Sequence, residues 1–109
     1  MSESPSCLVV FCTCPNRDIG ERLAREAVEK RLVACVNMVP GVISIYEWEG
    51  QVVHEEEVLL VAKTTRETFA ELEILWNKLH PYELPEVIAV PIEAGSEPYL
   101  QWIDGIVSR

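Results

Sequence analysis

The chain has 109 residues, which is the size of one domain with a small hydrophobic core. Acidic residues outnumber basic residues 18 to 9, so nucleic acid is not an expected partner. No apolar stretch approaches the ~20 residues of a membrane helix, and the polar N-terminus lacks the basic region of a secretory signal. We therefore expect a single cytoplasmic domain over residues 1–109, with residues 1–5 as a disordered tail and no membrane partner.

The first half of the chain predicts a strand, a helix and a second, longer strand. Residues 7–14 are rich in β-branched and aromatic side chains, which is typical of a strand. From residue 17 to about residue 32, apolar residues recur at the spacing of an amphipathic helix. Residues 34–49 predict one long strand, and Pro40-Gly41 within it indicates a bulge or bend.

The middle of the chain predicts a hairpin followed by a second helix. Glu49-Gly50-Gln51 is typical of a hairpin turn, and residues 51–64 form the returning strand. We expect Thr65 to cap the helix, with Thr68 at the third helical position. The helix should end at His80, since the following proline disfavours helical backbone there.

The end of the chain completes an α+β fold. Residues 87–92 predict a fourth strand, and residues 99–107 predict a short terminal helix. The order β-α-β-β-α-β plus a short helix is that of a ferredoxin-like sandwich, with an antiparallel sheet and two helices on one face. The two middle strands are longer than a small core needs, so we expect long hairpin arms.

The strands carry more apolar residues than such a sandwich requires. Residues 7–12, 58–62 and 87–92 are almost continuously apolar and do not alternate with polar residues. A sheet covered by helices on one face only should have a polar second face. Either the sheet curls over itself or a partner chain covers that face, and the long arms favour a homo-oligomer of closed symmetry.

Two cysteines stand on one side of the first strand. Cys12 and Cys14 alternate with Thr13, which places them roughly 6–7 Å apart at a rise of ~3.3 Å per residue, near a strand end that reaches solvent. Thiolates with an imidazole select copper or zinc, whereas a free cysteine often acts as a small buried hydrophobe. Because the first strand of this fold is central, we do not expect Cys12 beside residues 80–86 within one chain, although the two can meet across a subunit interface.

The loop of residues 80–86 concentrates polar groups between two prolines. It reads His80-Pro81-Tyr82-Glu83-Leu84-Pro85-Glu86, and the prolines make it stiff. Stiff loops with convergent polar side chains often carry function, but a rigid turn between a helix and a strand explains the same residues. The chain lacks G-x-S-x-G, H-E-x-x-H and a glycine-rich phosphate loop, so we do not expect an enzyme.

Three features of the middle strands have separate interpretations. Tyr46 and Trp48 share one face of the arm near its turn, and we interpret them as interface residues. His54 and the three glutamates after it predict a solvated outer part of the arm. Lys63 stands near the end of an apolar strand, where it can pair with Glu86 or a neighbouring carboxylate, or bind an anion.

Much of the chain resembles the divalent-cation-tolerance (CutA) family. The matching segments are Leu8-Val9-Val10-Phe11-Cys12-Thr13, Arg31-Leu32-Val33-Ala34-Cys35-Val36, Ile45-Tyr46-Glu47-Trp48-Glu49-Gly50, Lys63-Thr64, the residues 80–86 given above, and Tyr99-Leu100-Gln101-Trp102-Ile103. The loop motif and the Tyr-x-Trp-x-Gly motif are specific to this family.

The resemblance implies a ferredoxin-like subunit in a very stable homotrimer, held by edge pairing of long strands. It also implies binding of copper (Cu²⁺) and other divalent cations, and a cytoplasmic location in bacteria. Within the family, copper binding is tied to the cysteine that ends the first strand, here Cys12, and to the residues that correspond to His80 and Glu86. Cys14 replaces what is more often a small residue and offers an additional soft ligand.

Two other functions remain open beside metal binding. The architecture resembles that of trimeric nitrogen-signalling proteins, which implies a signalling or ligand-sensing trimer with a small molecule in the cleft between subunits. Lys63, Tyr82 and Glu86 would then surround an organic ligand. The third possibility is an interaction scaffold whose loop residues stabilise the assembly.

Overall fold

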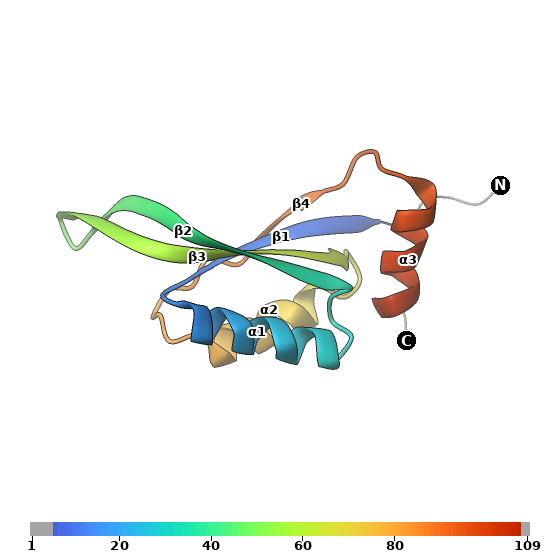
Figure 1. Cartoon of the computed structure of the whole chain (residues 1–109), viewed down its shortest axis with the longest axis horizontal. Coiled ribbons are helices and arrows are strands. Elements are labelled where there is room, and N and C mark those ends of the chain that lie inside the picture. Colours follow the sequence, from blue (N-terminus) through green and yellow to red (C-terminus); the bar gives the residue numbers. More distant parts are fainter. Residues whose placement is uncertain (1–5, 108–109) are drawn as a thin grey trace.

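A computed structural model describes residues 6–107 and shows an α+β fold (Figure 1). A four-stranded antiparallel sheet has the order β2-β3-β1-β4, and α1 and α2 lie together on one face of it. The elements are β1 (Cys7–Cys14), α1 (Arg17–Glu29), β2 (Cys35–Trp48), β3 (Gln51–Thr65), α2 (Phe69–Leu79), β4 (Ile88–Pro91) and α3 (Glu97–Val107). The predicted fold class is confirmed, while the predicted tail of residues 1–5 lies outside the described residues.

The first helix ends earlier than its apolar pattern predicts. The α1 helix begins after Asn16, whose side chain accepts a hydrogen bond from the Ile19 amide, and it ends at Glu29. Arg31 has a left-handed φ of 58°, and the Leu32 amide donates to the Ala27 carbonyl oxygen at 2.9 Å, as in a Schellman motif. Leu32 is still buried, because this turn folds it back onto the core, and the apolar spacing therefore continues past the helix.

The second helix also begins later than predicted. Thr65 is the last residue of β3 and pairs with Cys7 of β1, so the strand pairing keeps it out of the helix. The α2 helix starts at Phe69 after Thr68, whose side chain makes no capping hydrogen bond. The predicted end is confirmed, because His80 has extended backbone before Pro81.

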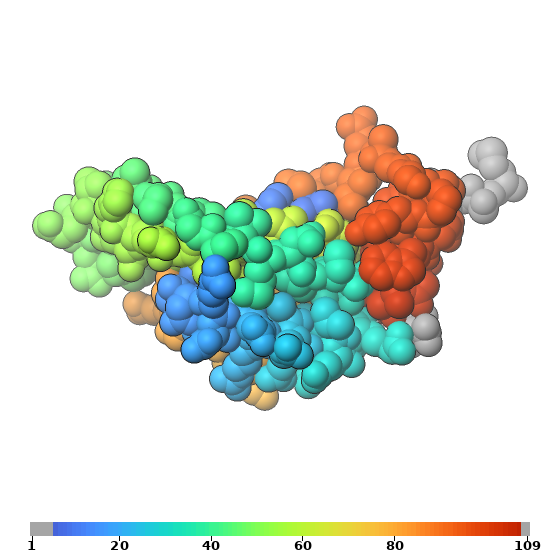
Figure 2. Space-filling view, viewed as in Figure 1, coloured from blue at the N-terminus to red at the C-terminus, as the bar shows by residue number. Residues whose placement is uncertain are grey.

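The β2–β3 hairpin projects beyond the rest of the sheet, as Figures 1 and 2 show. Glu49 and Gly50 both have positive φ, at 50° and 80°, which gives the tight turn a twist that suits a hairpin. The register shifts between Val39 and Val42, and this confirms the bend predicted at Pro40-Gly41. Because β1 pairs only with residues 58–65 of β3, residues 42–57 form an arm that the other strands do not reach.

The main core lies between the sheet and the two long helices. Trp76 of α2 is fully buried there, and its indole Nε1 donates to the Leu23 carbonyl oxygen of α1 at 2.9 Å. The α3 helix packs Leu100 and Ile103 against Cys7 at the start of β1. No helix within residues 6–107 has the length and hydropathy that a membrane crossing requires.

The other face of the sheet is apolar and has no helix over its centre. Val9 and Phe11 of β1 pair with Val90 and Ile88 of β4, and directly paired residues share a face. Ile88 and Val90 remain 54% and 46% exposed. The expected apolar second face is therefore present in the single chain.

Candidate functional site

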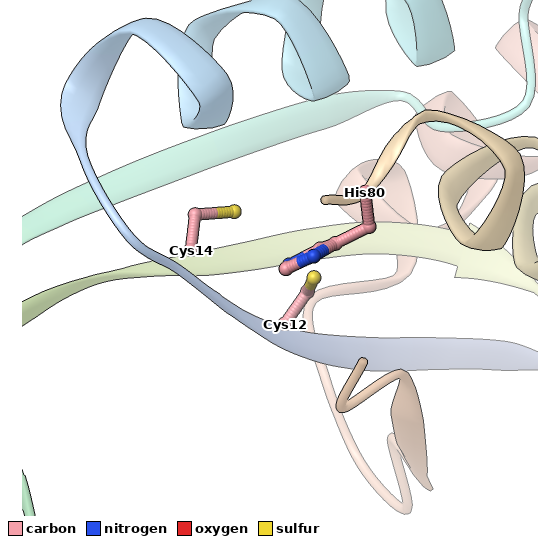
Figure 3. A group of neighbouring side chains, drawn as sticks. All are labelled: Cys12, Cys14 and His80. Carbon is pink, nitrogen blue, oxygen red and sulfur yellow. The ribbon is translucent and has the colours of Figure 1, made fainter. Parts of the chain in front are cut away.

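Three buried metal-binding side chains meet on the helix-covered face of the sheet. Cys12 and Cys14 both extend toward the core from β1, and His80 comes from the end of α2 (Figure 3). One ligand atom from each residue lies within 4.8 Å of the other two. We call these residues the Cys–Cys–His cluster.

The structure corrects two expectations about this cluster. Cys12 and the loop that begins at His80 are adjacent within one chain, because α2 packs across β1 and ends over Thr13, whose carbonyl oxygen lies 2.8 Å from the His80 Nε2. Neither thiol reaches solvent, since both cysteines are 0% exposed. Cys14, the last residue of β1, is still paired with Val58 of β3. The part of the sheet that the helices cover therefore extends to the end of β1.

Both nitrogens of the His80 ring take part in hydrogen bonds. The Tyr82 amide donates to Nδ1 at 3.2 Å, so Nδ1 must be the acceptor. A neutral imidazole then carries its proton on Nε2, which donates to the Thr13 carbonyl oxygen. A metal ion that binds His80 must therefore displace one of these two bonds.

The two thiols differ in acidity. The pKa of Cys12 is raised by its hydrogen bond with Cys14 and by burial, with the charges of Glu86 and Glu57 adding to the effect. The same hydrogen bond lowers the pKa of Cys14, although burial opposes this. Cys14 is therefore the thiol that more readily becomes a thiolate, and two sulfurs with one imidazole form a donor set that suits copper or zinc.

A groove of about 790 Å³ lies on the opposite face of the sheet. Thr13 lines it from β1, and the remaining walls are the hairpin arm and the loop after His80. The arm contributes Ser44, Ile45, Tyr46, Trp48, Glu55 and Glu57, and the loop contributes Pro81, Tyr82, Glu83, Leu84 and Glu86. We call this feature the arm groove.

Two phenol groups donate hydrogen bonds to carboxylates in the arm groove. The Tyr82 hydroxyl donates to Glu57 Oε2 at 2.6 Å, and burial together with this bond raises the pKa of Tyr82. The Tyr46 hydroxyl donates to Glu55, and this bond raises the pKa of Tyr46 to about 12. Both phenols therefore stay protonated at neutral pH and hold the glutamates in position.

Comparison with known proteins agrees with these features. The profile of the family described as CutA1 divalent ion tolerance protein matches residues 8–105. The chain belongs to this CutA family. It is 46% identical over 95 residues to the divalent-cation tolerance protein CutA of Thermus thermophilus, covering 87% of this chain and 92% of that protein.

Other CutA proteins show the same fold. The crystal structure of CutA1 from Oryza sativa superposes with a TM-score of 0.92 at 41% identity, over 96% of both chains. The PII-like protein CutA from Nostoc sp. PCC 7120 gives 0.86 at 37% identity, over 92% of this chain and 96% of that one. Human protein CutA is 48% identical over 93 residues, which are 85% of this chain but only 52% of the human protein. The chain thus spans about half of that relative.

The CutA fold separates the predicted site residues into different places. Glu86 is exposed and lines the arm groove, so it lies outside the Cys–Cys–His cluster. Tyr82 lines the same groove, but Lys63 does not. Within the single chain, the Lys63 Nζ donates to Asn37 Oδ1 at 2.7 Å, and its pairing with Glu86 stays a prediction. Lys63 lies opposite Val9, toward the other end of β1.

Two predicted interface residues and one missed residue meet in the arm groove. Tyr46 and Trp48 are 39% and 41% exposed and both line it. Glu57 was expected to be solvated with its glutamate neighbours, but it is only 5% exposed. Side chains alternate between the two faces along β3, and this pattern could have predicted the position of Glu57. Because Val58 faces the core, the preceding Glu57 must face the groove.

Proposed function

We propose that this CutA chain binds copper, as a cargo ion, through Cys12, Cys14 and His80, and that this binding underlies divalent-cation tolerance. The observation that carries the proposal is the convergence of three buried donors from two elements within 4.8 Å of one another. Soft sulfur donors favour copper over oxygen-preferring cations such as magnesium. Other divalent ions with an affinity for sulfur, such as zinc, suit the same donors.

Glu86 has a supporting part in this proposal. Its charge acts on Cys12, as the raised pKa of that thiol indicates. The negative charge of Glu86 disfavours the thiolate form of Cys12, but the same charge attracts a cation. Glu86 therefore favours entry of the ion near Cys12. Direct ligation by Glu86 requires the loop of residues 80–86 to move.

Metal titration of matched serine variants tests the proposal. We expect Cys12→Ser and Cys14→Ser each to weaken copper binding by roughly tenfold or more, because serine removes the soft ligand and keeps a similar volume. Cys7→Ser is the control, since Cys7 is also buried in β1 but lies at its other end. Anaerobic titration calorimetry on all four proteins gives the affinities, and unchanged binding in both cluster variants contradicts the proposal.

We also infer that the chain forms a homotrimer. The apolar open face of the sheet and the projecting arm support an assembly in which other copies cover both. A cytoplasmic location and the absence of catalysis stay predictions. A relative from Arabidopsis thaliana is named as chloroplastic, so location differs within the family.

A second candidate function is the binding of a small molecule in the arm groove. The volume of about 790 Å³ lies within the ~300–1,000 Å³ typical of small-molecule sites. Tyr82 and Glu86 of the predicted ligand cleft both line it. This candidate is independent of the Cys–Cys–His cluster, which faces the core on the other side of the sheet.

A further inference from the structure

We propose that the Cys–Cys–His cluster takes copper as the monovalent ion Cu⁺, held by three protein ligands, and discriminates against Cu²⁺ and zinc. This inference rests on the proposed copper binding and names the oxidation state of the ion. It departs from the Cu²⁺ that the family resemblance implies. The type of donor, the number of donors and their burial each favour Cu⁺.

The donor set consists of two sulfurs and one imidazole nitrogen, without a carboxylate. In Figure 3 the thiol groups of Cys12 and Cys14 point toward the His80 ring, and one ligand atom of each residue lies within 4.8 Å of the other two. Sulfur ligands select Cu⁺, whereas Cu²⁺ is typically held in tetragonal sites of nitrogen and oxygen ligands. Glu86, the acidic residue that the sequence associates with this site, lines the arm groove instead.

The cluster supplies three ligands and not four. The converging group of histidine, cysteine and acidic side chains found within residues 6–107 has only these three members. Over the same residues, every buried side-chain nitrogen or oxygen already has a hydrogen-bond partner, so no further polar side chain is free to complete the site. Zinc in proteins is almost always four-coordinate and takes water where the protein supplies three ligands. Cu⁺ is stable with fewer ligands, so three donors suit it better.

Burial removes water as a source of additional ligands. Both cysteines are 0% exposed, and His80 is 7% exposed. Leu60 and Val58 of β3, which pair with Cys12 and Cys14, belong to the same buried apolar core. Apolar surroundings do not hold ordered water, and they control which charge state of a bound metal is favoured. Cu²⁺ and zinc therefore cannot complete their coordination here as they would at an exposed site.

The strand pairing favours metal binding over a disulfide between the two thiols. Cys12 and Cys14 both stay in the antiparallel ladder with β3, so the backbone between them is extended. Alternate Cβ atoms of a strand lie roughly 6–7 Å apart at a rise of ~3.3 Å per residue, whereas a disulfide needs about 3.5–4.5 Å. Two thiols on such a backbone can share one ion without leaving the ladder, but they cannot form a disulfide without distorting it.

The first experiment compares ions on the full chain under anaerobic conditions. Competition with the cuprous chelator bicinchoninate gives the affinity for Cu⁺, and calorimetric titration with zinc sulfate gives the affinity for zinc. We expect Cu⁺ to bind more tightly than zinc by roughly a hundredfold or more. X-ray absorption of the copper-loaded protein should show a cuprous edge, with two sulfurs and one nitrogen around the ion.

Matched alanine variants test the number of sulfur ligands. Cys14→Ala should weaken Cu⁺ binding by roughly tenfold or more and remove one sulfur from the X-ray absorption spectrum. Cys7→Ala is the control, because Cys7 is buried at the other end of β1 and should change neither readout. Cys14→Ser provides a second replacement, and circular dichroism of each metal-free variant shows whether it has kept its fold. Unchanged affinity and an unchanged spectrum in both Cys14 variants would overturn the three-ligand site.

The remaining outcomes separate this inference from the proposed function. Zinc binding as tight as Cu⁺ binding overturns the inference, and so does a Cu²⁺ electron paramagnetic resonance signal that depends on Cys12 or Cys14. If the ion bound in that case loses affinity in Cys12→Ser and Cys14→Ser, the cluster remains the metal site and only the oxidation state is wrong. If no ion loses affinity in either variant, the inference and the proposed function fail together.

Discussion

Arg31 shows how a single residue in strained backbone affects stability. It occupies the position after the α1 helix where glycine is usual, with a left-handed φ of 58°. A side chain at this φ costs roughly 1–2 kcal/mol, and the two hydrogen bonds that close the helix keep the residue there. The chain thus accepts local strain to fold Leu32 onto the core.

Replacement of Arg31 should therefore stabilise the protein. We expect Arg31→Gly to raise the free energy of unfolding by about 1 kcal/mol, because relief of the strain exceeds the added freedom of the unfolded chain. Chemical denaturation measures this change. Arg31→Ala removes the same positive charge without relieving the strain, so a similar gain in that variant would attribute the effect to charge.

At the scale of elements, the packing of α2 places His80 beside β1. Trp76 lies one turn before His80, is 0% exposed and binds the Leu23 carbonyl oxygen of α1. The indole thus connects the two helices on the covered face of the sheet. The Cys–Cys–His cluster depends on the position of α2, since two of its members come from β1 and the third comes from the end of α2.

Trp76→Phe should destabilise the fold by about 2–3 kcal/mol, because it leaves a cavity and removes the buried hydrogen bond from the indole to the Leu23 carbonyl oxygen. Trp102→Phe is the control, since Trp102 is 44% exposed on α3 and should change stability little. Denaturant unfolding of both variants measures the difference. An equal loss in the two variants would show that burial of Trp76 is not what stabilises the helix pair.

At the scale of the whole molecule, exposed apolar residues lie over the open face of the sheet. We expect light scattering to give a mass three times the 12.3 kDa of one chain. Ile88→Glu should shift the protein toward monomers, because Ile88 is 54% exposed on this face and an unpaired carboxylate is costly in an apolar interface.

Ile74→Glu provides the matched control for this experiment. Ile74 is 69% exposed on α2, away from the open face, so its replacement should leave the mass unchanged. A trimeric mass for Ile88→Glu as well would exclude this part of the open face from the interface.

The sequence by itself determined most of the local structure of this protein, although not the end of α1 or the start of α2. The spacing of Leu23 and Ala27 predicted an amphipathic helix, Glu49-Gly50 predicted the hairpin turn, and Pro81 predicted the end of α2. These features depend on backbone preferences and on periodicity between near neighbours, so a short stretch of sequence carries the whole signal. The order of the elements and the motif resemblance then led to the correct fold class and family.

The tertiary structure decided which distant groups meet. His80 reaches Cys12 and Cys14 across more than 60 residues, because α2 packs on the same face of the sheet as both thiols. Lys63 is separated from Glu86 because the register of β3 on β1 places it beside Val9. Glu57 is buried because Tyr82 covers it from the loop. Each of these outcomes depends on how helices and strands pack against one another. Patterns among neighbouring residues in the sequence do not determine this packing.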